Sequence, residues 1–364
     1  MNRAGLLVLG LIFALTTPAL PAGALDTLNQ GKVELQSAGA LAFGPKGILF
    51  VGDSTAAVIW ALDTSDRSKR APVAINLSGI DSKLAALLGT SRDQVLINDM
   101  AVNPLSHNAY LSVSRGRGPK ADPLLFRVDA AEKLSELKLD SIGHSKISLP
   151  NAPDPQAKNR RGHSLRQEAI TDLAFVNDQV IVAGLSNEEF ASNLRSLDFP
   201  FSSANAGTSV EIFHGAHGKF ETNSPVRTFV PFEIKTEPHI LAAYTCTPLV
   251  KFPMSALTPG TKVVGTTIAE LGNRNRPLDM VVYSKGGKDF VLMNNSSRGV
   301  MKLPTGNLDS FGGITQKTGI SGAPYETISG LEGVKQLDRL DESNALLLLQ
   351  TDDGPVDLKT IAFP

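Results

Sequence analysis

Acidic side chains recur at the start of short apolar segments along this chain. Ile97-Asn-Asp-Met-Ala-Val102, Ile170-Thr-Asp-Leu-Ala-Phe175 and Pro277-Leu-Asp-Met-Val-Val282 each place an aspartate before apolar and small residues. Looser copies put acids at Glu237 and Glu332. If these segments converge, their carboxylates could hold a hard cation such as Ca²⁺, which takes roughly six to eight oxygen ligands. The metal-ligand set predicted on this basis is Asp99, Asp172, Asp279, Glu332 and His239.

The same acids have a structural interpretation. Each carboxylate can accept hydrogen bonds from backbone amides of a neighbouring repeat, because buried amides require a partner. An acid that recurs in most repeats favours this interpretation, since a binding site needs asymmetry.

Arginines form the second pattern. Many of them lie in loops expected on one side of the fold, which we call the upper face. On this side the innermost strand of each repeat begins, and the turn between its second and third strands lies there too. Arginine forms bidentate hydrogen bonds with carboxylate or phosphate groups, so these residues could bind an anion. The alternative is a solvated rim whose arginines have scattered counter-ions. The predicted ligand-binding residues are Arg115, Arg117, Arg160, Arg161, Arg274, Arg276 and Arg298.

Cysteine and histidine supply the remaining candidates. Cys246 is the only cysteine; a buried, inert thiol is favoured over a metal ligand, a nucleophile or an intermolecular bridge. His214-Gly-Ala-His217 has metal-like spacing, but its glycine and position predict a turn on the face opposite the upper one. His163, inside a long upper segment, is the candidate catalytic base, with a polar loop residue as the alternative.

The elements that must position these residues repeat along the chain. The clearest units are Gly47 to Trp60 and Asp289 to Leu303, where two apolar strands flank a small or polar break. Weaker copies cover 109–128, 179–213, 240–252 and 345–361. Small sheets repeated in this way must pack radially to bury their faces. The sequence therefore predicts an all-β propeller of six blades, with seven as the alternative.

Closure of the ring is predicted from the N-terminal side, with Lys32 to Gln36 supplying the fourth strand of the last blade. A closed ring removes exposed sheet edges. Ser82 to Leu88 is expected to form a helix, and two upper-face insertions are expected at 141–168 and 186–207. Insertions of this length are often binding elements.

The N-terminus resembles a secretory signal. Arg3 precedes the apolar run Ala4 to Leu15, and Ala22-Gly23-Ala24 fits the small-residue cleavage rule. The expected organisation is a signal over 1–24 and one propeller domain over 25–364, secreted or periplasmic, with no membrane span after cleavage. Removing Arg3 leaves 34 basic against 36 acidic residues, a balance that does not indicate a nucleic-acid partner.

The unit Gly47 to Trp60, with Asp53-Ser54 between two strands, resembles the NHL-type repeat. The six-unit count is similar to the gluconolactonase and paraoxonase propellers, and that resemblance implies calcium held by channel carboxylates and asparagines. No G-x-S-x-G, H-E-x-x-H, P-loop or C-x-x-C-H motif is present.

Three functions remain open on the sequence alone. The leading one is a non-catalytic module that binds an anionic small molecule or an acidic protein surface through the upper face. The second is a calcium-dependent lactonase or esterase, in which the cation polarises a carbonyl and a carboxylate or His163 activates water. The third is a structural subunit.

Overall fold

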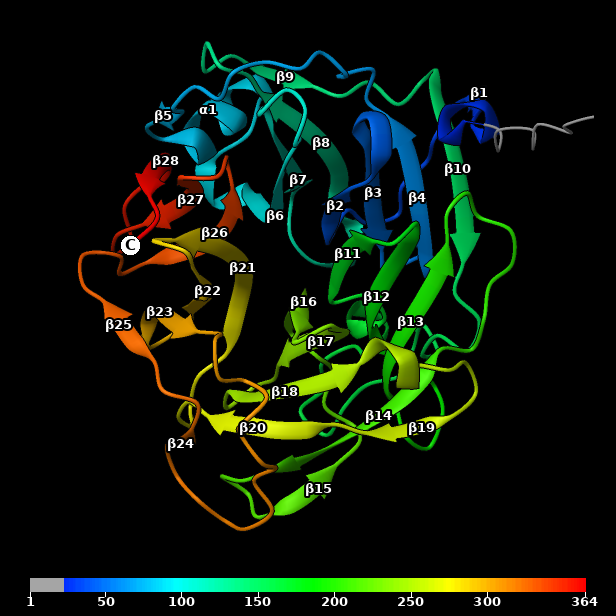
Figure 1. Cartoon of the computed structure of the whole chain (residues 1–364). Helices are drawn as coiled ribbons and strands as arrows, with labels where there is room; N and C mark the ends of the chain where they lie inside the picture. Colours follow the sequence, from blue (N-terminus) through cyan, green and yellow to red (C-terminus); the bar gives the residue numbers. More distant parts are fainter. Residues whose placement is uncertain (1–22) are drawn as a thin grey trace, which may run out of the picture.

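Six small, mainly antiparallel sheets surround a central channel in the computed structural model, which describes residues 23–364 (Figure 1). The predicted all-β, six-bladed propeller is confirmed. Residues 1–22, which make up most of the predicted signal, lie outside the described part of the chain. Over residues 23–364, no helix has the length and apolar character needed to cross a membrane.

The first three blades have the following strands, ordered from the channel outward. Blade 1 contains β2 (Leu41–Phe43), β3 (Ile48–Asp53), β4 (Val58–Asp63), β10 (Ile142–Ser148) and β1 (Asn29–Gly31). Blade 2 contains β6 (Val95–Val102), β7 (Ala109–Arg115), β8 (Asp122–Val128) and β9 (Leu134–Glu136). Blade 3 contains β11 (Asp172–Val176), β12 (Gln179–Leu185), β13 (Ser192–Asp198), β14 (Thr208–His214) and β15 (Lys219–Glu221), and β14 also pairs with β19 (Lys262–Val264).

The other three blades follow the same plan. Blade 4 contains β16 (Thr228–Ile234), β17 (Glu237–Ala243), β18 (Pro248–Pro253), β20 (Thr266–Glu270) and β24 (Ser321–Gly322). Blade 5 contains β21 (Pro277–Lys285), β22 (Lys288–Asn295), β23 (Gly299–Pro304) and β25 (Glu326–Ile328). Blade 6 contains β26 (Val334–Arg339), β27 (Asn344–Gln350), β28 (Val356–Ala362) and β5 (Asn76–Leu77).

The second strand of each blade is largely buried on both faces because each blade is packed between two others. Successive side chains of a strand point to opposite faces. Along β3, Ile48 and Phe50 join the core shared with blade 3, whereas Leu49 and Val51 join the core shared with blade 2. All six residues of β3 are buried, which explains why its first four residues, Ile48 to Val51, form an unbroken apolar run in the sequence.

The chain does not visit the blades in ring order. The innermost strands adjoin one another in the circular order β2, β6, β26, β21, β16, β11 (Figure 1). Blade 2 therefore lies between blades 1 and 6. Everything from β5 to β9 is inserted between the third and fourth strands of blade 1, and β10 returns to complete that blade.

Ring closure differs from the prediction. The fourth strand of blade 6 is β5, whose Leu77 and Asn76 pair with Leu358 and Lys359. The segment 32–36 forms no strand, and the N-terminal β1 pairs instead with β10. The reason is the insertion, because the chain leaving β4 passes the open edge of β28 before it enters blade 2.

Parts of the two predicted insertions form strands of the blades. Residues 142–148 form β10, which leaves 149–165 as the loop, and the 186–207 segment contains β13, the third strand of blade 3. The expected helix is present as α1 (Ile80–Leu87). Short 3-10 turns complete the structure at Ala24–Thr27, Pro45–Gly47, Arg92–Gln94, Gly118–Lys120, Arg166–Glu168 and Met254–Ala256.

Candidate functional site

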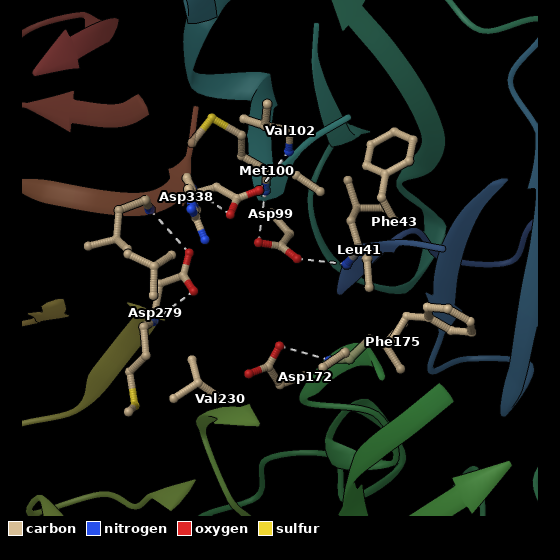
Figure 2. Close-up of a pocket in the computed structure, with 18 of the residues that line it drawn as sticks. Leu41, Phe43, Asp99, Met100, Val102, Asp172, Phe175, Val230, Asp279 and Asp338 are labelled. Atoms are coloured by element: carbon tan, nitrogen blue, oxygen red, sulfur yellow. Dashed lines mark hydrogen bonds between the residues drawn. The ribbon is translucent and has the colours of Figure 1, made fainter. Parts of the chain in front are cut away.

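Four aspartates from four different blades face the central channel. Figure 2 shows Asp99, Asp172, Asp279 and Asp338 on the innermost strands of blades 2, 3, 5 and 6, with their carboxyl groups directed around one opening. Three of the four were expected from the sequence. The fourth, Asp338, was missed, and it replaces Glu332 as the acid that blade 6 contributes.

Each of these aspartates joins two blades through a repeated pair of hydrogen bonds. One carboxylate oxygen accepts from the amide of the next residue, and the other accepts from an amide of the adjacent blade. For Asp99 these donors are Met100, at 2.8 Å, and Leu41, at 2.7 Å. The equivalent inter-blade bonds run from Phe229 to Asp172, from Leu337 to Asp279 and from Val102 to Asp338. These bonds are the ones expected if the acids serve the structure, with each carboxylate accepting from backbone amides of a neighbouring repeat.

Local irregularities in the strands aim two of these side chains. The pairing of β6 with β7 shifts register between Ile97 and Asp99, and that of β21 with β22 shifts between Pro277 and Asp279. A bulge inserts one unpaired residue and re-aims the side chains that follow it. The extra residues, Asn98 and Leu278, therefore turn the aspartates toward the channel.

The channel carboxyls are more easily protonated than ordinary aspartates. Burial raises the pKa of Asp172 to about 7 and that of Asp338 to about 6. The pKa values of Asp99 and Asp279 are also raised, first by burial and then by repulsion from the other aspartates. Loss of solvation disfavours a buried anion, and nearby like charges add to the effect.

Only three of the five predicted calcium ligands come together. Glu332 is exposed and accepts from the Gly330 amide. His239 lies at the start of β17, the second strand of blade 4, where its Nδ1 contacts the Glu237 carbonyl. His239 was assigned to the wrong position because β16, not β17, lines the channel. The aspartates that do converge have both oxygens bonded to amides, as the structural interpretation requires, and a calcium site among them stays a prediction.

Two cavities meet at the aspartates. Below them lies a space of about 440 Å³ whose walls combine the aspartates with apolar side chains such as Phe43, Phe175 and Val230 (Figure 2). Above them, on the upper face, lies a smaller recess of about 130 Å³. Asp99, Asp172 and Asp279 line both, so they lie between the larger lower space and the upper mouth.

The upper recess carries two arginines. Arg276 lines it and has no carboxylate within 4.0 Å among residues 23–364, whereas the neighbouring Arg227 pairs with Glu168. Although Arg276 reaches solvent, partial burial of its guanidinium, and then repulsion from Arg227, lowers its pKa. Gln336 donates from Nε2 to the Asn98 carbonyl, and its buried Oε1 has no partner. The recess therefore offers one unpaired cation and one free acceptor.

The other predicted arginines do not line this recess. Arg115 pairs with Asp122, Arg117 donates to the Asp93 carbonyl, and Arg298 donates to the Asn273 carbonyl. The remaining three are exposed on loops: Arg160, Arg161 and Arg274. His163 is also exposed and lines neither channel cavity.

Cys246 and the His-Gly-Ala-His turn are placed together, contrary to expectation. Cys246 lies in the turn between β17 and β18, and one nitrogen from each of His214 and His217 lies within 4.8 Å of its Sγ. The two histidines were expected on the opposite face. They lie instead at the end of β14, a fourth strand, which runs toward the upper face.

The site residues that the sequence analysis did not identify have only weak local patterns around them. Asp338 is followed by Arg339, so the acid-plus-apolar pattern of the other blades is broken. Arg227 directly precedes β16, and a correct assignment of β16 as an innermost strand would have placed it at the mouth. Gln336 lies two residues before Asp338 and becomes significant only once that aspartate is recognised.

No family model and no curated protein matches this chain. It is similar in structure to a PQQ-bound aldose sugar dehydrogenase from Streptomyces coelicolor, with 13% identity, a TM-score of 0.37, and coverage of 92% of this chain and 96% of the other. A Thermus thermophilus protein named as an oxidoreductase (glucose dehydrogenase) gives 13% identity, a TM-score of 0.36, and coverage of 92% and 100%. An engineered GH43 glycoside hydrolase gives 10% identity, a TM-score of 0.37, and coverage of 74% and 51%. What the strand topology itself establishes is a six-bladed β-propeller.

Proposed function

We propose that this protein is an exported, non-catalytic binding propeller whose upper channel mouth takes a small carboxylate. The observation that carries this proposal is Arg276, a guanidinium that lines a recess and has no acidic partner among residues 23–364. Arginine binds carboxylates through paired, charge-assisted hydrogen bonds. The N-terminal pattern of Arg3 followed by an apolar run supports export.

The recess also limits what the ligand can be. Its volume of about 130 Å³ admits a small acid or the acidic end of a larger molecule. The unpartnered Oε1 of Gln336 favours a ligand that carries a hydrogen-bond donor as well as a negative charge. Hydroxy acids and amino acids have both groups.

The aspartates beneath the recess are compatible with an anion in mildly acidic solution, because their raised pKa values increase the fraction of neutral carboxyls. Asp172, with a pKa of about 7, is largely neutral in mildly acidic solution. Anion binding should therefore tighten as the pH falls. We favour binding without turnover because the carboxyl oxygens accept hydrogen bonds from backbone amides. These bonds hold the carboxyls in a structural role and not in that of a catalytic acid or base.

The test is titration calorimetry with a panel of small acids that includes malate, lactate and glutamate. We expect Arg276→Gln to weaken the best ligand about 10- to 100-fold, the loss of a charge-assisted hydrogen bond. Arg160→Gln, on an exposed loop, is the matched control and should have no effect. If no acid binds, or if both variants bind like the parent protein, the proposal fails. Binding of an acidic protein that depends on Arg160 would support the protein-partner alternative.

A further inference from the structure

Three side chains that the proposed function does not use meet where blades 3 and 4 adjoin. One imidazole nitrogen of His214, one of His217 and the Sγ of Cys246 all lie within 4.8 Å of one another. Over residues 23–364, no other set of three histidine, cysteine or acidic side chains meets this spacing. We propose that these residues form a binding site for a divalent ion of the Zn²⁺ class.

The β14–β15 hairpin brings the two histidines side by side. β14 ends at His214, and the chain turns back at Gly218, whose amide donates to the His214 carbonyl at 2.8 Å. The two imidazole centroids are 3.9 Å apart. Gly215 is required within the turn, because a Cβ there would lie 2.9 Å from Cγ of Glu270. The short spacing in sequence therefore becomes a pair of adjacent ligands.

Glu221 orients both imidazoles. Its two carboxylate oxygens contact Nδ1 of His214 at 2.9 Å and Nδ1 of His217 at 2.6 Å. A carboxylate on one ring nitrogen fixes the tautomer and leaves the other nitrogen free to bind a metal, an arrangement common around metal-binding histidines. Both Nε2 atoms are therefore the available donors.

An unpartnered buried atom points independently to a ligand. His214 is only 2% exposed, and its Nε2 has no hydrogen-bond partner. Buried polar atoms are normally satisfied. Glu270 is 1% exposed and shows the same deficit, with Oε1 accepting from the Gly215 amide while Oε2 has no partner. A bound cation would satisfy His214 and balance the charge of Glu270.

The thiol is held in place by a constrained turn. Cys246 and Thr247 both have positive φ, at 65° and 59°, a conformation that non-glycine residues rarely adopt. Two bonds from the blade 5 side fix the turn, from the Cys246 amide to the Asn275 carbonyl and from Thr247 Oγ1 to the Gly272 carbonyl. Cys246 is thus presented to the histidines by its backbone.

The donor set selects the ion. Two imidazoles and one thiolate suit Zn²⁺, whereas Ca²⁺ and Mg²⁺ prefer oxygen ligands. Three protein ligands leave one tetrahedral position for water, and His217, whose side chain is 46% exposed, keeps the site open to solvent. The ion would tie blade 3 to blade 4 in a chain whose single cysteine permits no internal disulfide.

The experiment uses the full chain, stripped of metal with a chelator and titrated with Zn²⁺ against a chromophoric competitor. We expect one equivalent to bind. In a parallel titration with Co²⁺, we expect tetrahedral ligand-field bands together with a thiolate-to-cobalt charge-transfer band. Cys246→Ser should remove the charge-transfer band, and His217→Ala should weaken Zn²⁺ binding more than 100-fold, since even Glu221→Gln, which removes no ligand, should cost about 10- to 100-fold.

The control is His163→Ala, which alters an exposed histidine distant in sequence from the three proposed ligands, and this variant should bind Zn²⁺ like the parent protein. The assignment is overturned if the parent chain binds no Zn²⁺, or if Cys246→Ser and His217→Ala bind it with unchanged affinity. If either variant fails to fold by circular dichroism, the Co²⁺ spectrum of the parent chain decides, because a spectrum without the thiolate band overturns the site. These readouts do not involve Arg276, so they are independent of the proposed carboxylate function.

Discussion

The carboxylate of Asp338 accepts a hydrogen bond of 2.6 Å from the amide of Val102, 236 positions earlier in the sequence. This bond joins blade 6 to blade 2, two blades that are adjacent in space but lie toward opposite ends of the chain. The same inter-blade contact recurs from Asp99, Asp172 and Asp279, each directed to the next blade in the same sense around the ring. The channel acids are therefore ties between blades as well as walls of a cavity.

Removing one tie should destabilise the fold. Asp338→Ala leaves the Val102 amide without its partner, and an unsatisfied buried donor costs about 1–3 kcal/mol. We expect a loss of about 2 kcal/mol in the free energy of unfolding at pH 5, measured by chemical denaturation. Asp353→Ala, on an exposed loop, should change stability by less than about 0.5 kcal/mol. Equal losses in the two variants would refute the structural role of Asp338.

Stability should fall as the pH rises from 5 to 8. The folded-state pKa values of Asp172 and Asp338 are about 7 and about 6, above the value for an unfolded chain. The folded state therefore binds more protons in this window, so its advantage is complete at low pH and is lost as the pH passes these values. The loss should be on the order of 2 kcal/mol, a figure reduced for the solvent screening of partly exposed carboxyls.

The measurement is denaturant unfolding at several pH values in the parent protein and in Asp172→Asn. The variant cannot ionise at this position, so its stability should vary less with pH. A parent protein whose stability is constant or increases from pH 5 to 8 would contradict the raised pKa values.

The strand that closes the ring can be tested by truncating one side chain. Leu77 in β5 is 7% exposed and belongs to the core shared by blades 2 and 6. Leu77→Ala should cost about 2–5 kcal/mol, the usual range for a buried leucine. Leu87→Ala, at a position that is 60% exposed, should have little effect. If Leu77→Ala were equally mild, β5 would not be contributing to closure.

Gly184 is expected to tolerate no side chain. A Cβ at this position in β12 would lie 2.0 Å from the carbonyl oxygen of Ala169, and backbone atoms cannot move aside as a flexible side chain can. We expect Gly184→Ala to cost about 2–3 kcal/mol, as overpacking typically does. Gly306→Ala, where no atom lies within 4 Å of the added Cβ, is the control. Thermal unfolding of both variants distinguishes the two sites.

The two mouth arginines should contribute unequally to carboxylate binding. Glu168 already balances the charge of Arg227, whereas Arg276 has no such partner among residues 23–364. Arg227→Gln should therefore weaken the ligand less than Arg276→Gln does, by less than about 10-fold. Calorimetry with the same acid checks this order, and a reversed order would place the anion nearer to Arg227.

The sequence was most informative where a residue's environment depends on its own blade. The apolar pairs around Asp53 and around Asn294 predicted second and third strands, because strands packed between two blades must be apolar on both faces. The aspartates of the three regular motifs were also located correctly, since each is followed by the same short apolar pattern in its innermost strand.

Prediction failed where the environment depends on another part of the chain. β5 is only two residues long, and no local pattern shows that its partner is β28. Glu237 was taken for a channel residue because β16 and β17 are similarly apolar and only their order in the sheet distinguishes them. The meeting of Cys246 with His214 arises from contact between blades 3 and 4, which no spacing in the sequence encodes.

The pairing of β5 with β28 has a consequence for biosynthesis. A nascent chain exposes residues 76–77 early, but the strand that must receive them, residues 356–362, is translated about 280 residues later. Blade 6 can therefore be finished only once β28 has emerged from the ribosome, after the strands of the other five blades have been made. Until then the incomplete propeller exposes unpaired strand edges, which are surfaces that molecular chaperones can bind.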